Sequence, residues 1–588
     1  MRFLTLLLLG APSVLAKCKC TPTDDCWPSA STWNTLNATV HGKLLHNQPI
    51  AEPCYPGADY NAQLCQSISA EWTNSTFIGA EPIGYCYPLT DACPPINATV
   101  SAYPSCDLGT APVYAINATE ADDVATGIKF AQENNVRLVI KNTGHDIVGR
   151  SQGYGSLMIW IKYIQNGVNY HETYTPSDGC PSNWTSSAFT VGGGYIWKNL
   201  YDAAAAHGRI VVGGSDPTVG AIGGYLQGGG HGPMSHYFGL GTDQVLEMTV
   251  VLASGDIVTA NACQHPDLFT ALRGGGGGTY GVVVSTTIKA HPDRPVLGHT
   301  LDVVPLNNNF PALLNISATI LSKYPLLLDT GFTGDGDLIS TQSEKAYVHS
   351  FGKLLPPNTT ASSNIIQQAK STINQHLLGD LLPYNSTTVA IQSTWSLFPS
   401  FLDYYNAGSH QDTTGVSDIL LTSRMFDKPS LTNNTHNLTT MLHTIFAGNP
   451  NGTTLIELAL IGGGQVLHPE PYTAVNPAWR KTYLLAEPVV LWPDETSPEE
   501  VKRIRDDMTF NKTDAMRALT PGMGSYVNEA DGDDPLWKED FFGSNYDWLQ
   551  SIKMKYDPDD VFYCWRCVGS ERWTEEKGGS GYGRLCQA

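Results

Sequence analysis

The spacing of hydrophobic positions predicts a strand–helix–strand unit that begins near Pro112. The apolar run over 113–116 has the length and composition of a strand. Apolar residues at helical spacing then predict a helix over 121–134, and a second strand follows over 136–140. This unit ends in a turn with glycine and histidine at 142–146, which is a common place to bind a ligand.

Further strand and helix patterns alternate with three clusters of glycine. The patterns predict strands over 189–194, 245–252 and 282–288, and a helix over 196–207. The glycine clusters occupy 213–220, 223–231 and 273–278. A single cluster is usually a set of tight turns, whereas three in one region indicate a backbone that approaches a ligand closely.

The glycine clusters favour a pyrophosphate ligand. Consecutive backbone N–H groups bind anions, so no basic side chain is needed, and 213–232 contains no lysine. The pattern G-x-G-x-x-G does not follow the first strand, and G-x-x-x-x-G-K-[ST] is absent from the chain. NAD and ATP are therefore disfavoured as ligands.

The N-terminal region and the glycosylation sequons along the chain indicate an exported protein. Arg2, the apolar run 3–9 and the small residues before Lys17 predict a signal peptide over 1–16. Eight of the thirteen cysteines lie between Cys18 and Cys106, which predicts a disulfide-held segment over 17–108 in an oxidising compartment. The chain also has twelve glycosylation sequons: Asn37, Asn74, Asn97, Asn117, Asn183, Asn315, Asn358, Asn385, Asn433, Asn437, Asn451 and Asn511.

Charge and composition narrow the possible partners. The formal net charge of −21 argues against binding to nucleic acid or to an anionic membrane surface. No later apolar run approaches the ~20 residues that span a bilayer. With 41% hydrophobic and 15% charged residues, the 588-residue chain can bury two or three lobes. We expect an extracellular monomer that acts on a small molecule.

Several spaced motifs resemble one flavoprotein superfamily. The segments 139–146, 216–220 and 228–232, with the glycine run after Arg273, resemble the PCMH-type FAD-binding domain of the vanillyl-alcohol oxidase superfamily. The segments 526–528, 542–545 and 555–562 resemble the closing motif of berberine-bridge-enzyme-like oxidases. The nearest subgroup is the secreted fungal isoamyl-alcohol-oxidase-like proteins.

This resemblance implies an α+β fold with two lobes and FAD between them. The expected order is the cysteine-rich segment 17–108, the FAD-binding domain 109–292 and an α/β substrate domain over 293–520. The C-terminal segment 521–588 then returns to the FAD-binding domain. The segment 555–562 is equally consistent with an ordinary helix end and a turn at Asp557-Pro558.

The resemblance assigns the cofactor contacts residue by residue. His145 matches the histidine that bonds to the 8α-methyl of FAD; an ordinary turn histidine is the alternative. Asp216 stands where many relatives have a second flavin-linking cysteine, so FAD is expected to be attached through His145 alone. The remaining cofactor residues are Asn142, Thr143, Gly144, Asp146, Thr218, Val219, Gly220, Gly223, Gly224, Gly228, Gly230, His231, Val283 and Asn545.

The resemblance also suggests how the enzyme uses oxygen. Val219 matches a position beside the flavin where a small side chain indicates an oxidase that reduces O₂. The alternative is a β-branched residue that fills the core. Relatives carry substrate-facing residues on a strand that corresponds to 457–468. His468 and Gln465 are therefore candidate catalytic residues, with Tyr526 and Asn528, although a histidine beside a proline on a loop is more often a surface residue.

These features predict a secreted FAD-dependent oxidase. A hydride would pass from an alcohol, sugar or secondary-metabolite substrate to flavin N5, and O₂ would be reduced to H₂O₂. One alternative is a flavin-dependent oxidative cyclase or desaturase of secondary metabolism. Another is a secreted carbohydrate-binding glycoprotein without catalysis. We expect no metal ion in the site.

Overall fold

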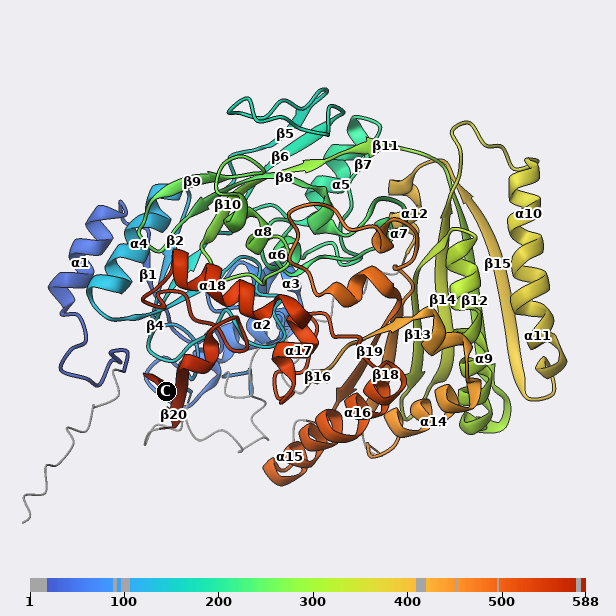
Figure 1. Cartoon of the computed structure of the whole chain (residues 1–588). Coiled ribbons are helices and arrows are strands. Elements are labelled where there is room, and N and C mark those ends of the chain that lie inside the picture. The colour runs from blue at the N-terminus through green and yellow to red at the C-terminus, as the bar shows by residue number, and fades with distance from the viewer. Residues whose placement is uncertain are drawn as a thin grey trace, which may run out of the picture.

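The chain folds into two lobes joined by a C-terminal segment that crosses back to the first (Figure 1). A computed structural model describes residues 18–87, 93–96, 106–408, 419–449, 452–493, 496–577 and 583–588. The predicted signal peptide, 1–16, lies outside the described residues. No helix in these ranges is long and apolar enough to cross a bilayer.

The first lobe begins with a four-stranded sheet in the order β1-β2-β4-β3. Its strands are β1 (Leu44–His46), β2 (Tyr114–Asn117), β4 (Ser156–Trp160) and β3 (Arg137–Lys141). β2, β4 and β3 are parallel, because helix α4 (Ala121–Glu133) provides the crossover from β2 to β3. Val124 and Ile128 of α4 are fully buried against this sheet, as their helical spacing predicts.

A five-stranded antiparallel sheet completes the first lobe, in the order β5-β6-β10-β8-β9. The strands are β5 (Val168–His171), β6 (Ala188–Gly192), β10 (Val282–Lys289), β8 (Val245–Val251) and β9 (Ile257–Ala260). Helix α5 (Trp197–Ala206) follows β6, and helix α8 (Pro266–Leu272) precedes the last glycine cluster. Trp197 and Leu200 of α5 lie in the main core, so the helix anchors the loops that follow it.

The second lobe is an antiparallel sheet of eight strands, and its main path runs β15-β12-β14-β13-β18-β19-β16. These strands are β15 (Val389–Phe398), β12 (Val296–Pro305), β14 (Lys345–Leu354), β13 (Phe332–Ser340), β18 (Thr453–Ala459), β19 (Thr482–Leu491) and β16 (Ile419–Leu421); β17 (Arg424–Asp427) also pairs with β19. Helices α9 (Phe310–Asp329), α10 (Asn364–Ile373) and α14 (Thr435–Ile445) cover one face (Figure 1).

The two faces of this sheet differ in chemistry. Leu338, Ile456 and Leu458 point toward α9 and α14, and join their leucines in one buried cluster. Because side chains alternate along a strand, residues 337 and 457 point away from those helices. A bond from the hydroxyl of Ser215 to Asp335 Oδ2, at 2.6 Å, shows that this second face turns toward the first lobe.

The C-terminal segment ties the first lobe together. Helices α17 (Trp537–Phe542) and α18 (Tyr546–Tyr556) lie across the first lobe (Figure 1). The ammonium of Lys553 pairs with Asp557 and donates to the carbonyl oxygens of Thr279 and Phe562 at 2.9 and 2.6 Å. The helix ends at Tyr556, before Pro558, as the sequence predicts.

Six disulfides involve twelve of the thirteen cysteines. Three of them, Cys20–Cys26, Cys54–Cys65 and Cys93–Cys106, lie within the cysteine-rich segment as expected. Cys18 instead bonds to Cys586, so the segment is tied to the far end of the chain. The others are Cys180–Cys263 and Cys564–Cys567. The thirteenth cysteine, Cys86, is buried.

Candidate active site

The turn at 142–146 packs directly beneath the glycine-rich backbone. A Cβ atom on Gly220 or Gly223 would lie 2.6 or 3.0 Å from the amide nitrogen of Asn142, so a larger residue at either position would have to displace that side chain. That amide also donates to the carbonyl of Gly193 at 2.9 Å. Gly144 has φ of +90°, and its added Cβ would meet the Lys141 side chain at 2.8 Å.

His145 is held by hydrogen bonds that orient its ring. Its Nε2 lies 2.7 Å from the Thr218 hydroxyl, which donates to Asp216 Oδ1 at 2.9 Å. Nε2 therefore has Thr218 as a partner, and Nδ1 is on the side of the Asp216 carboxylate. Asp216 Oδ2 is 4.0 Å from Nδ1, beyond hydrogen-bond distance.

The glycine clusters converge on one region that fits a large polar ligand. The carbonyl of Gln227 accepts hydrogen bonds from the backbone N–H groups of Gly274 and Gly276, at 3.0 and 2.9 Å. Gly224 faces open space, since a Cβ there would meet nothing within 4 Å. Oδ1 of Asn142 and Oε1 of Gln227 are buried and have no hydrogen-bond partner among the described residues. Hydroxyl and imide donors of FAD suit such acceptors.

Beside this cradle, the loop after Gly228 meets the C-terminal segment. The Tyr526 hydroxyl accepts from the Gly230 N–H at 3.2 Å and from the Asn528 amide at 2.7 Å. The same amide donates to the carbonyl of Gly224 at 3.0 Å. The ring of His231 lies 5.1 Å from that of Tyr526, at a steep angle. The predicted residues Tyr526, Asn528 and His231 are thus brought together.

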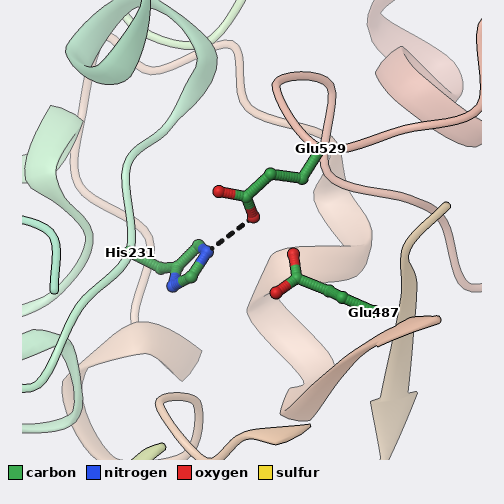
Figure 2. Close-up of side chains that lie close together, drawn as sticks. All are labelled: His231, Glu487 and Glu529. Carbon is green, nitrogen blue, oxygen red and sulfur yellow. Dashed lines mark hydrogen bonds and ion pairs between the residues drawn. The ribbon is translucent and has the colours of Figure 1, made fainter. Parts of the chain in front are cut away.

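His231 forms a three-residue cluster with two glutamates (Figure 2). Its Nε2 lies 2.9 Å from Glu529 Oε2, and the Glu487 side chain is hydrogen bonded to Glu529. Burial opposes ionisation of Glu529, but the charge of His231 and hydrogen bonds from Glu487 and His231 outweigh it and lower the pKa of Glu529. Burial of His231 lowers its pKa, yet the charge of Glu529 produces a net rise.

Glu487 carries the proton of this cluster. Burial, followed by the charge of Glu529, raises the pKa of Glu487 well above its usual range. Glu487 therefore stays neutral and donates to Glu529, while Glu529 and His231 form an ion pair. Ligand atoms of the three residues lie within 4.8 Å of one another, so the cluster also has a spacing that a metal ion could use.

A third glutamate lies beside this cluster. Glu457 on β18 is directly opposite Glu487 on β19, so both side chains point to the same face. Solvent reaches the Glu457 side chain. The protein packed around it still removes part of its hydration, and this desolvation raises the pKa of Glu457 to about 8, with further contributions from the charges of Asp337 and Glu529. The site therefore holds several carboxyl groups and one cationic side chain, His231.

Other predicted site residues occupy supporting positions. Val283 is buried in β10, and Val219 is partly buried against the main core. The Asn545 amide donates to the carbonyls of Ala474 and Val475 at 3.2 and 2.9 Å. Gly274 packs against the same two residues. Asp146 pairs with Arg150, whose guanidinium also donates to the carbonyl of Val527. These residues connect the glycine loops to the C-terminal segment.

The strand expected over 457–468 is shorter in the structure. β18 ends at Ala459, because the chain turns at Gly463 and Gly464, which have φ of +63° and +46°. Gln465 lies in a short 3₁₀ helix, Gly464–Leu467, and His468 follows it as an exposed residue. Among the described residues, no hydrogen bond or ion pair joins either residue to His231, Glu487 or Glu529. Their catalytic role stays a prediction.

Sequence reasoning missed the three glutamates. Glu457 and Glu487 are single acidic residues within the apolar runs 455–461 and 484–491, and such an isolated charge in a buried strand is a usable signal. Glu529 lies one residue after the predicted Asn528, without any local pattern to mark it. Its meeting with His231 depends on how the two segments fold together.

Fold and site together define a class of protein. Glycine loops without basic side chains, a turn histidine oriented by Thr218, and a sheet that presents acids to them are features of a flavin-dependent oxidoreductase. Residues 112–261 match the family model of the FAD binding domain, and 525–565 match the berberine and berberine like model.

Full-length similarities place the chain more narrowly. It is 39% identical over 585 residues to FAD-linked oxidoreductase apf9 of Gibberella fujikuroi, with 97% of each chain covered. It is 32% identical to the bifunctional decalin synthase calF of Penicillium decumbens, with 98% of this chain and 96% of that one covered. The VAO-type flavoprotein MtVAO713 from Myceliophthora thermophila C1 superposes with a TM-score of 0.91 at 35% identity, covering 98% of this chain and all of that one. The chain belongs to the FAD-linked oxidoreductases of the vanillyl-alcohol oxidase and berberine-bridge type.

Proposed function

We propose that this chain is an extracellular oxidase that carries FAD on a single covalent bond to Nδ1 of His145. The hydrogen bond between Nε2 and Thr218 supports attachment through the other ring nitrogen, since Nε2 already has a partner and the ring is held in one orientation. Asp216 cannot form the thioether that a cysteine would. The disulfides support an oxidising compartment, and Cys18 becomes the second residue once a signal peptide is cleaved before Lys17.

The reaction is the two-electron oxidation of a small organic substrate. FAD, when bound, would supply the acceptor for a hydride from the substrate carbon and the two electrons that reduce O₂ to H₂O₂. The carboxylate of Glu529 accepts the proton that the substrate hydroxyl loses. His231 holds this carboxylate in place, and neutral Glu487 donates a hydrogen bond that keeps it oriented.

The observation that carries this proposal is the ionised Glu529 beside the Gly228–His231 loop. In a panel of simple alcohols and oligosaccharides, we expect the purified protein to form H₂O₂ with at least one member. Glu529→Gln should then lower kcat by about 10²–10⁴-fold, the usual contribution of a general base. Its visible flavin spectrum should stay unchanged. Full activity of the variant would exclude Glu529 as the proton acceptor.

Covalent attachment is tested separately from turnover. Wild-type protein, denatured in acid and run on a denaturing gel, should give a flavin-fluorescent band. His145→Ala should give none, while Asp216→Cys, which restores the residue common in relatives, tests whether a second link can form. Fluorescence that persists in His145→Ala would place the bond elsewhere, and colourless wild-type protein would refute the flavoenzyme proposal.

The spacing of His231, Glu487 and Glu529 makes a metal requirement a further point to test. The proposed proton transfer needs no metal ion. We therefore expect dialysis against EDTA to leave both the rate of H₂O₂ formation and the flavin spectrum unchanged. Loss of activity that Zn²⁺ or Mn²⁺ restores would assign the cluster to metal binding instead.

A second candidate function is oxidative cyclisation or desaturation in secondary metabolism. The similarity to a protein named bifunctional decalin synthase supports it. The same cofactor and acceptor would serve, but the substrate would be a specific biosynthetic intermediate. An enzyme that reduces its flavin with no alcohol or oligosaccharide in the panel, yet has normal flavin content, would favour this candidate.

A further inference from the structure

A row of carboxyl groups crosses the second lobe and ends at the cluster of Figure 2. Glu487 is opposite Glu457, and Glu457 is opposite Asp337 on β13. Across Val348 of β14, the row continues to Asp302 on β12. We call Asp302, Asp337, Glu457 and Glu487 the acidic row. At about 4.8 Å per strand, it extends over about 19 Å.

The face that carries the acidic row has no compensating positive charge of its own. On the described strands from β15 to β19, the in-register residues of this face include no lysine or arginine. Asp335, two residues before Asp337, adds a fifth acid to the same face. Carboxylates directly opposite each other on neighbouring strands repel, which, together with burial, favours the protonated forms of Glu457 and Glu487 while no cation is bound.

Elsewhere in the described chain, several buried acids have a basic partner. These pairs include Asp243–Arg480, Asp540–Arg424 and Asp557–Lys553. Glu487 is equally buried, with 3% of its surface exposed, but its neighbours are Glu457 and Glu529. Its Oε1 has no hydrogen-bond partner in the described residues. A buried acceptor without a donor points to a ligand that supplies one.

We propose that the acidic row binds a cationic nitrogen of the substrate, either a protonated amine or a guanidinium. This inference rests on the proposed function and names its substrate class. The cation would lie between Glu457 and Asp337, one or two strands and so about 5–10 Å from Glu487, which lies beside Glu529 in Figure 2. There it would relieve the repulsion within the row and donate to carboxylate oxygens. Exposed Glu457 gives such a group access from solvent.

Two matched probes separate charge from shape. 4-(Aminomethyl)benzyl alcohol carries a hydroxyl and an ammonium at the two ends of one ring, and 1,4-benzenedimethanol replaces the ammonium by a second hydroxyl. Binding to the holoenzyme is followed without O₂ by the change in the flavin absorption spectrum, at pH 7.5 and low salt. We expect the ammonium probe to bind about tenfold more tightly or better.

Variants show whether the acidic row causes this preference. Glu457→Gln and Asp337→Asn should each bring the two dissociation constants to within about threefold, since each removes one carboxyl group that the bound ammonium would hold in its ionised form. Glu344→Gln, an exposed acid on the turn between β13 and β14, should keep the full preference. Raising the salt concentration should weaken binding of the ammonium probe alone.

The inference fails if the two probes bind equally well, or if Glu457→Gln and Asp337→Asn keep the preference. Equal binding of both probes that is lost in the variants would make the row a hydroxyl-binding surface instead. A protein without a flavin spectrum would refute the proposed function first, before any probe is added. The two failures are therefore distinguishable.

Discussion

At the scale of single residues, one buried lysine, Lys141, stabilises the turn that carries His145. The Lys141 ammonium donates to the carbonyls of Glu81, Pro82 and Gly84 at 2.9, 2.9 and 2.5 Å. It also lies 4.9 and 5.3 Å from the ring centres of Tyr85 and Trp160. Burial lowers the pKa of Lys141 to about 7, but three carbonyls and two ring faces form a site for the charged form.

Lys141 links the cysteine-rich segment to the flavin-binding turn. The loop that it binds continues to Cys86, whose N–H donates to the carbonyl of Gly144 at 3.1 Å. On the other side, the Trp160 indole donates to the carbonyl of Asn142 at 3.1 Å. The backbone on both sides of His145 is therefore fixed through groups that surround this one ammonium.

Lys141→Met should reduce covalent flavin attachment. Without the ammonium, three carbonyls lose their donor, and the loop over 81–86 no longer holds Gly144 in place. We expect the flavin-fluorescent fraction on a denaturing gel to fall severalfold, while non-covalently bound flavin remains in the native protein. Lys129→Met, which removes an exposed lysine of α4, is the control. An unchanged fluorescent fraction in Lys141→Met would show that the turn keeps its position without the lysine.

Glu457→Gln should stabilise the protein at alkaline pH. The pKa of Glu457 rises from 4.5 to about 8 on folding, so the folded state binds the proton more tightly than the unfolded state. Stability from this group is fully present below pH 4.5 and is lost as the pH rises to 8. Exposure of Glu457 moderates the loss, because solvent screens the neighbouring Asp337, Glu529, Asp335 and Asp216.

The measurement is the thermal unfolding midpoint of the two proteins as a function of pH. The variant should match wild type near pH 4.5 and exceed it at pH 8. Glu344→Gln should follow wild type across the range. Equal midpoints for wild type and Glu457→Gln at both pH values would show that Glu457 ionises without strain.

At the scale of elements, the glycine clusters serve two different purposes. Some allow close packing: a Cβ on Gly232 would lie 1.9 Å from the carbonyl oxygen of Gly213, and one on Gly228 would lie 2.4 Å from the Asn528 amide. Gly224 at the start of α6 (Gly224–Gly228) is different, since it faces open space. Space beside a glycine, where its neighbours are tightly packed, marks the position where the cofactor would approach the backbone.

Gly224→Ala should lower flavin content without lowering stability. The new methyl group meets no protein atom within 4 Å, so the polypeptide itself should fold and unfold as wild type does. FAD that approaches this backbone would meet the methyl group, and the ratio of visible to protein absorbance should fall. Gly57→Ala, where a Cβ also meets nothing within 4 Å, is the matched control outside the clusters. Normal flavin content in Gly224→Ala would place the cofactor elsewhere along the loops.

At the scale of the whole molecule, the sequence predicts local structure better than long-range contacts. The helix expected over 121–134 is α4, Ala121–Glu133, and the strand expected over 282–288 is β10, Val282–Lys289, because each pattern is contained within one element. The fold class followed from the motifs, and the flavin contacts stay predictions. The acidic row was not foreseen, because it depends on the register of strands from β12 to β19, and Asp302 and Glu487 are 185 residues apart in sequence (487 − 302).

The disulfide between Cys18 and Cys586 is a second long-range feature that the sequence could not define. It joins residues 568 positions apart, and backbone bonds beside it link Lys19 to Leu585. The cysteine-rich segment lies against the first lobe: Cys20 donates its N–H to the carbonyl of Asn135, and the Lys141 loop lies further along. The bond therefore ties the start of the cysteine-rich segment to the C-terminal strand β21 (Gly583–Gln587), next to the start of β3.

Removing this bond should destabilise the protein more than removing a short-range one. In the chain-entropy account, a disulfide that closes a long loop restricts the unfolded state more, with typical effects of about 2–4 kcal/mol. Cys18→Ser with Cys586→Ser should therefore lower the thermal midpoint, measured at a fixed scan rate, and speed the loss of native flavin absorbance. Cys20→Ser with Cys26→Ser removes a disulfide whose cysteines are only 6 positions apart, and it should lower the thermal midpoint less. If the thermal midpoint falls equally in both double variants, the Cys18–Cys586 disulfide stabilises the protein no more than the short-range Cys20–Cys26 disulfide does.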